Sequence, residues 1–133
     1  AILTYAFLPR LPAWTEARRR IARSYLDGIS SDALRIPHPP ADSDSCWHLF
    51  PVQVKPERKP EAIAHFKTRN IAVGEHYPLA LIEHKALRSP RREVGSTCLR
   101  AREFCHGEIS LPIHPYLNED ETATVIEACN AWH

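Results

Sequence analysis

The fold follows from Ile71-Ala72-Val73-Gly74-Glu75-His76-Tyr77-Pro78, a short apolar run that ends in His-Tyr-Pro. Asn70 precedes the run, and asparagine tolerates the left-handed conformation in which many helices end. Pro78 closes it, because proline has no backbone N–H to give to a sheet. We therefore expect a strand at 71–78 that presents His76 and Tyr77 at an edge.

A second strand is expected upstream of this run, in Cys46-Trp47-His48-Leu49-Phe50-Pro51-Val52-Gln53-Val54. Aromatic and β-branched residues dominate it, and Pro51 inside it predicts an edge strand or a bulge. A helix from Lys59 to about Arg69 follows, since Lys59-Pro60 suits a helix start and the apolar residues recur at helical spacing. Residues 46–78 thus predict strand–helix–strand.

Helical signals are clearest near the two ends of the chain. After Pro12, apolar residues recur at helical spacing up to a stop at Gly28; the stripe is Trp14, Ala17, Ile21 and Tyr25. Asn118 and Glu121 form a capping box that predicts a helix through Trp132. Between them we expect a short helix at 96–104 and a strand at 108–115, whereas residues 1–10 fit a strand or a helix end.

These elements predict one α+β domain over residues 1–133, with helices packed on one face of a small sheet. The net charge is +1, from 17 basic and 16 acidic side chains, which argues against a nucleic-acid binder. No apolar run reaches the length of a membrane span, and no signal peptide is recognisable. The four cysteines lack a disulfide or metal spacing, which favours buried or semi-buried free thiols in a reducing cytoplasm over a disulfide.

The residues offer few candidates for chemistry. The eight histidines lack the spacing of a zinc site, so no metal is expected. Ser110 lacks the glycines of a nucleophile elbow, and no glycine-rich phosphate loop is present. Trp47-His48 and His76-Tyr77 remain, either as half-buried structural pairs or, on two strands of one sheet, as one edge of a pocket.

Three segments in order, Ser45–Val52, Ile71–Pro78 and Ile109–Leu117, resemble the C-terminal part of the DegT/StrS-type sugar aminotransferases. This resemblance covers nearly all of the chain. It implies the small domain of a fold-type I aminotransferase, with a short antiparallel sheet and helices on one side. Members of this family use pyridoxal phosphate to transfer an amine, typically from glutamate, to a keto sugar carried on a nucleotide.

The resemblance also implies site residues and partners. His76 and Tyr77 would face the nucleotide-linked keto sugar, with Trp47 and His48 second. The lysine that binds pyridoxal phosphate covalently belongs to the family's large domain, so no cofactor is expected on this chain alone. We expect that large domain as a partner in cis or in trans, an exposed apolar surface where it packs, and a homodimer. The alternative is a stand-alone module that binds or assembles without catalysis.

Overall fold

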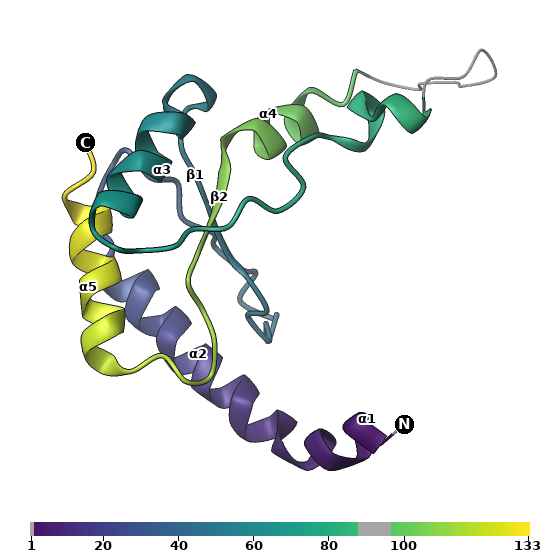
Figure 1. Cartoon of the computed structure of the whole chain (residues 1–133), viewed down its shortest axis with the longest axis vertical. Helices are drawn as coiled ribbons and strands as arrows, with labels where there is room; N and C mark the ends of the chain where they lie inside the picture. Colours follow the sequence, from purple (N-terminus) through teal and green to yellow (C-terminus); the bar gives the residue numbers. More distant parts are fainter. Residues whose placement is uncertain (1, 88–96) are drawn as a thin grey trace.

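The computed structural model describes residues 2–87 and 97–133 (Figure 1). The sequence also predicts a charged loop at 89–95, which includes Arg91-Arg92; this loop and the expected helix start at Ser96 lie outside the described residues. The elements in order are α1 (Ile2–Phe7), η1 (Leu8–Arg10), α2 (Leu11–Gly28), β1 (Phe50–Gln53), η2 (Pro56–Arg58), α3 (Lys59–Thr68), η3 (Leu81–Glu83), η4 (Lys85–Leu87), α4 (Leu99–Gly107), β2 (Glu108–Leu111) and α5 (Glu119–Asn130).

The sheet consists of β1 and β2, which pair antiparallel with Phe50 opposite Leu111 and Gln53 opposite Glu108. A single residue pair extends the sheet at each of its two edges. Arg35 pairs with Gln53 beside β1, and Gly74 pairs with Ser110 beside β2. The expected α+β fold is confirmed, but the sheet is smaller than the sequence predicts.

The strand expected at 71–78 is wrong, since only Gly74 pairs with β2 within it. The Ile71 N–H bonds back to the Phe66 carbonyl at the end of α3, at 3.0 Å. Two residues after Gly74, the His76 N–H donates to the Glu108 carboxylate at 2.9 Å and not to a backbone carbonyl. Both flanks of Gly74 therefore use their backbone donors outside the sheet.

Both other strands are shorter than predicted. β1 begins only at Phe50, because Trp47 adopts a left-handed conformation with φ 48° that breaks the extended run. β2 ends at Leu111, immediately before Pro112. Pro51 lies in an edge strand, as predicted. The Gln53 N–H points away from β2, to the Arg35 carbonyl. The backbone nitrogen of Pro51, two residues earlier, points to the same outer side, so its missing N–H costs no hydrogen bond to β2.

The core lies between the sheet and α2, α3 and α5, which gather on one side of it (Figure 1). Tyr25 of α2, Phe50 of β1 and Phe66 of α3 are fully buried. The Tyr25 hydroxyl donates to the Pro112 carbonyl at 2.7 Å, and its ring packs edge-on against Phe50 with centroids 5.1 Å apart. The apolar stripe predicted for the first long helix thus faces the core, with Trp14 only half-buried.

Helix ends follow the sequence signals closely. Asn70 has φ 58°, as predicted for the residue after a helix end. Asn118 accepts from the Glu121 N–H at 2.8 Å while the Glu121 carboxylate accepts from the Asn118 N–H at 2.9 Å. Gly28 is the last residue of α2 but does not take the left-handed conformation. A Cβ there would lie 3.0 Å from Ile126, so the glycine lets α2 pack closely against α5.

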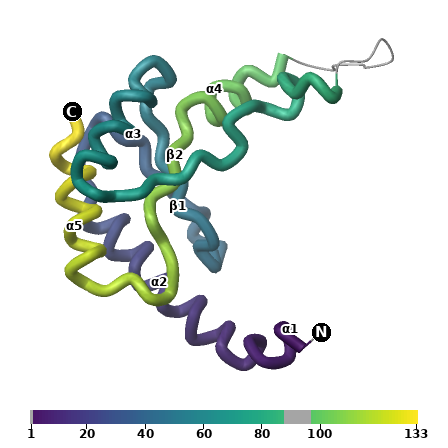
Figure 2. Tube along the Cα trace, in the orientation of Figure 1, coloured from purple at the N-terminus to yellow at the C-terminus, as the bar shows by residue number. Residues whose placement is uncertain are grey.

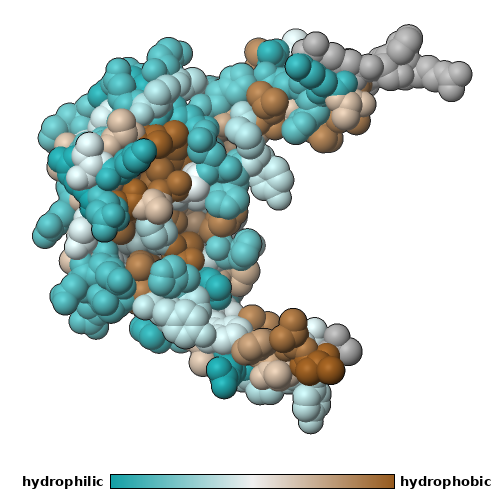
Figure 3. Space-filling view, in the orientation of Figure 1, coloured by the Kyte–Doolittle hydropathy of each residue, from teal (hydrophilic) through white to brown (hydrophobic). Residues whose placement is uncertain are grey.

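Two arms extend from the body of the molecule, and the Cα trace curves between them (Figure 2). Residues 2–10 form one arm, and they are helical, not extended, with Ile2, Leu3 and Tyr5 largely exposed. The other arm carries η3, η4 and α4, with Leu81 and Leu99 exposed. Apolar surface appears at both arms in Figure 3, so the expected exposed apolar surface is present.

Candidate functional site

The segment that carries His76 runs along the edge of β2 and contacts side chains on one face of this strand. Glu108 and Ser110, two residues apart on this strand, share that face and are 1% and 3% exposed. Glu108 accepts from the His76 N–H, and the Ser110 hydroxyl donates to the other Glu108 oxygen. The His76 Nδ1 lies 2.9 Å from the same Ser110 oxygen. His76 is thus anchored by both its backbone and its ring.

Gly74 makes room for this arrangement. Its backbone exchanges two hydrogen bonds with Ser110, at 2.9 and 2.8 Å. A Cβ at this position would lie 2.8 Å from the Cε1 atom of His76, closer than side chains tolerate. The imidazole therefore packs directly over the glycine, and any larger residue would displace it from Ser110.

Tyr77 points away from the body of the protein, with 79% of its surface exposed. Its backbone has φ 56°, a left-handed conformation that is unusual for a bulky residue and that clusters at functional sites. The next residue is Pro78, so the chain turns sharply here. His76 is anchored to β2, whereas the side chain of Tyr77 is exposed.

Trp47 and His48 do not join His76 and Tyr77. They precede β1 at the end of the sheet where Phe50 pairs with Leu111, whereas His76 bonds to Glu108 at the other end of β2. Trp47 stacks on Phe50 with centroids 5.2 Å apart and covers the core, and His48 is exposed. The two pairs therefore do not line one pocket edge within the described chain, and neither lies on a strand.

Charged side chains before and after His76 in the chain are held in ion pairs. Lys59, the first residue of α3, is buried and paired with Glu75 at 2.9 Å. Glu83 accepts from Arg102 at 3.2 Å and from His106 at 3.0 Å, which ties η3 to α4. Desolvation alone would raise the pKa of Glu83, but the Ala80 N–H together with Arg102 and His106 lowers it below its usual range.

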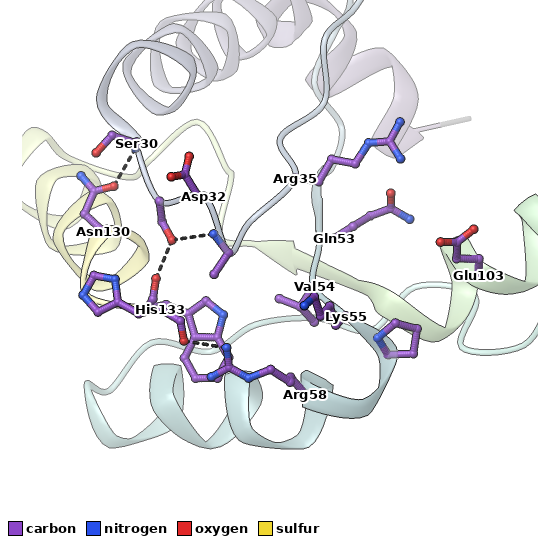
Figure 4. A pocket seen from close by; sticks show the side chains of 14 residues that line it. Ser30, Asp32, Arg35, Gln53, Val54, Lys55, Arg58, Glu103, Asn130 and His133 are labelled. Atoms are coloured by element: carbon purple, nitrogen blue, oxygen red, sulfur yellow. Dashed lines mark hydrogen bonds between the residues drawn. The ribbon is translucent and has the colours of Figure 1, made fainter.

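A hollow of about 770 Å³ lies elsewhere, between the segment after α2, the start of η2 and the end of α5 (Figure 4). Its walls carry both signs of charge, including Asp32, Arg35 and Arg58. Arg58 donates to the His133 carbonyl at 2.6 Å and lies 4.3 Å over the Trp132 ring. None of the four candidate residues lines it, and its contacts close the C-terminal end onto the body.

Residues 2–87 and 97–133 contain no cluster of histidine, cysteine and acidic side chains that would hold a metal. Within the same residues no helix has the length and apolar character of a membrane span. The four cysteines form no disulfide among the described residues. Cys129 is buried and Cys98 and Cys105 are half-buried, as expected, whereas Cys46 is exposed.

Sequence reasoning missed Glu108 and Gly74 as parts of the site. Ser110 was considered only as a nucleophile, and Glu108 only as a strand residue. One local signal was available: two polar residues at i and i+2 of an apolar strand lie on the same face, where a partner must satisfy them. That partner is His76, more than thirty residues away in the chain.

Comparison with known proteins gives one consistent result. The model of the DegT/DnrJ/EryC1/StrS aminotransferase family matches residues 1–130. A dTDP-3-amino-3,4,6-trideoxy-alpha-D-glucose transaminase from Streptomyces venezuelae is 32% identical over 94% of this chain and 32% of its own length. A dTDP-3-amino-3,6-dideoxy-alpha-D-galactopyranose transaminase from Aneurinibacillus thermoaerophilus is 34% identical over 88% of this chain. The chain spans about a third of the length of these curated relatives.

Solved structures agree on the fold. The crystal structure of S. venezuelae DesV in complex with a ketimine intermediate superposes with a TM-score of 0.87 at 30% identity. That match covers 98% of this chain and 34% of DesV. A family aminotransferase from Brucella abortus has a TM-score of 0.80 at 24% identity, covering 99% of this chain and 34% of its own. The architecture is therefore that of one third of a larger aminotransferase.

The lysines of this chain do not fit a covalent site for pyridoxal phosphate. Such a site needs a lysine whose amine is activated by desolvation in an apolar pocket and is left unpaired to react with an aldehyde. Lys59 is buried, but its ammonium is paired with Glu75 and lies 3.5 Å from the Cys105 carbonyl. The other three lysine side chains, Lys55, Lys67 and Lys85, are exposed.

Proposed function

Because the chain belongs to the DegT/DnrJ/EryC1/StrS aminotransferase family, we propose that it is the small, substrate-side domain of a nucleotide-sugar aminotransferase. The observation that carries this proposal is the coverage: 98% of the chain matches 34% of a complete sugar aminotransferase at a TM-score of 0.87. On this proposal residues 1–133 form one domain, and a large domain in cis or in trans holds the pyridoxal phosphate. When bound there, the cofactor would act as the electron sink for the transfer of the amino group.

The role of this chain is to bind the nucleotide-linked keto sugar and to exclude water from the reacting carbon. His76 and Tyr77 face the sugar on this proposal. The fixed imidazole and the exposed phenol offer hydrogen bonds of the kind that orient a polyhydroxylated ligand. Trp47 and His48 are second candidates that would contact another part of the ligand, since they lie at the opposite end of β2.

The exposed apolar residues of the two arms support the proposed partners. Leu3 and Tyr5 on α1, and Leu81 and Leu99 on the other arm, lack cover within the described chain. Isolated apolar patches of this kind mark interaction surfaces. We propose that they pack against the large domain in a cytoplasmic homodimer.

The test uses the protein together with any coding region that adjoins Ala1, loaded with pyridoxal phosphate. Amine transfer from glutamate to dTDP- and UDP-linked keto sugars is followed by mass spectrometry. His76→Ala and Tyr77→Phe should each raise the KM for the sugar about fivefold, since one lost hydrogen bond costs about 1 kcal/mol.

Matched controls are His38→Ala and Tyr116→Phe, which alter an exposed histidine and a 72% exposed tyrosine away from the segment. Both should leave KM unchanged. The proposal fails if no sugar of the panel is aminated. It also fails for His76 and Tyr77 if their substitutions behave like the controls.

A further inference from the structure

Glu108 determines which atoms carry the protons in the hydrogen-bonded cluster of Glu108, Ser110 and His76. An ionised carboxylate only accepts hydrogen bonds. Glu108 accepts one from the His76 N–H at 2.9 Å and one from the Ser110 hydroxyl, each on a separate oxygen. The single hydroxyl proton of Ser110 is therefore directed at Glu108 and away from His76.

The His76 ring must then supply the proton for its own contact with Ser110. The Ser110 oxygen turns a lone pair toward Nδ1, 2.9 Å away. A hydrogen bond at this distance needs one proton, which can only reside on Nδ1. A neutral imidazole carries a single ring proton, so Nε2 is left with a bare lone pair.

The lone pair of Nε2 is available to a ligand. His76 is exposed, and Nε2 has no hydrogen-bond partner among residues 2–87 and 97–133. Gly74 holds the ring in place from below, since its missing Cβ leaves the space that Cε1 occupies. Free rotation of the imidazole is thereby excluded while Nδ1 remains bonded.

From these contacts we propose that Glu108 and Ser110 are positioning residues that keep neutral His76 protonated on Nδ1, so that Nε2 accepts a hydrogen bond from a ligand hydroxyl. The identification of that hydroxyl as one of the sugar rests on the proposed function. The protonation itself does not. This assigns the imidazole as an acceptor and leaves donation to other groups, such as the Tyr77 hydroxyl.

His65 provides an internal control with the opposite arrangement. Its Nε2 lies 2.8 Å from the Ala128 carbonyl, which can only accept, so Nε2 carries the proton. Its Nδ1 accepts from Arg69 at 3.0 Å. One chain therefore offers both protonation forms under identical conditions.

The decisive experiment is NMR of the 133-residue chain with ¹⁵N-labelled histidine, recorded at about pH 8, where imidazoles of ordinary pKa are neutral. Long-range ¹H–¹⁵N correlations distinguish the two forms. His76→Gln and His65→Gln assign the two signals by their loss. We expect the Nδ1–H pattern for His76 and the Nε2–H pattern for His65. An Nε2–H pattern for His76 overturns the proposal.

Two variants test the cause. Ser110→Ala removes the acceptor, and Glu108→Gln replaces one carboxylate oxygen by a donor, which allows Ser110 to donate to Nδ1. Both should convert His76 to the Nε2–H pattern and leave His65 unchanged, while Ser110→Thr, which keeps the hydroxyl, should restore the Nδ1–H form. A His76 pattern that is unaffected by either variant refutes the roles of Glu108 and Ser110, even if the Nδ1–H form is seen in the parent chain.

The ligand is tested in the complete cofactor-loaded protein. Ser110→Ala should raise the KM for the sugar five- to tenfold with little change in kcat, and Ser110→Thr should recover it. An unchanged KM alongside a converted NMR pattern overturns the acceptor role toward the sugar. Absence of any sugar amination refutes the proposed function and the sugar as ligand, whereas the NMR result still decides the protonation of His76.

Discussion

Replacing Tyr25 by phenylalanine tests how α2 is joined to the segment that follows β2. The Tyr25 hydroxyl donates to the Pro112 carbonyl at 2.7 Å, 87 residues along the chain. The phenylalanine ring keeps the edge-on contact with Phe50, so almost no apolar contact is lost. The cost is the hydrogen bond and an unsatisfied carbonyl in a part-buried position, about 1–2 kcal/mol of unfolding free energy.

The assay is urea unfolding followed by circular dichroism and by tryptophan fluorescence. With a denaturant slope of roughly 2 kcal/mol per molar, the midpoint should fall by about 0.5–1 M. Tyr116→Phe is the matched control, because that hydroxyl is exposed and its removal should change the free energy by less than about 0.5 kcal/mol.

Equal midpoints for Tyr25→Phe and Tyr116→Phe would refute the reasoning, because they would mean that water replaces the buried hydrogen bond without cost. A loss well above about 3 kcal/mol would also contradict it, since this exceeds a single hydrogen bond and would require repacking of the core.

Three further predictions concern other parts of the chain. Burial raises the pKa of the Cys129 thiol from 9.0 to about 12. Because the unfolded chain loses this proton first, the free energy of unfolding should fall as the pH rises from 9 to 12. Cys129→Ala should flatten that part of a curve of unfolding free energy against pH. Asn118→Ala removes the cap of α5 and should cost about 1 kcal/mol in urea unfolding, and a loss near zero would show that the capping box contributes nothing. Mixed with pyridoxal phosphate, the chain alone should show no lysine-linked absorbance band after dialysis, because Lys59 is paired and the other lysines are exposed; a stoichiometric band would disprove this.

The sequence by itself determined the three helices of the core, α2, α3 and α5. Their signals are contained in a few neighbouring residues: the apolar stripe from Ala17 to Tyr25, the capping box of Asn118 and Glu121, and the left-handed Asn70. The resemblance of three segments to one family was also visible without coordinates, and it indicated the fold that the structure has.

Tertiary structure alone decided the length of the strands and the hydrogen bonds of His76. Strand length depends on where backbone donors find partners, and the His76 N–H finds Glu108, 32 residues away. The same long-range contact places Ser110 beside Nδ1 and makes Gly74 the support of the ring. Hydrogen bonds between residues so far apart leave no local pattern in the sequence, because either partner alone resembles an ordinary strand or loop residue.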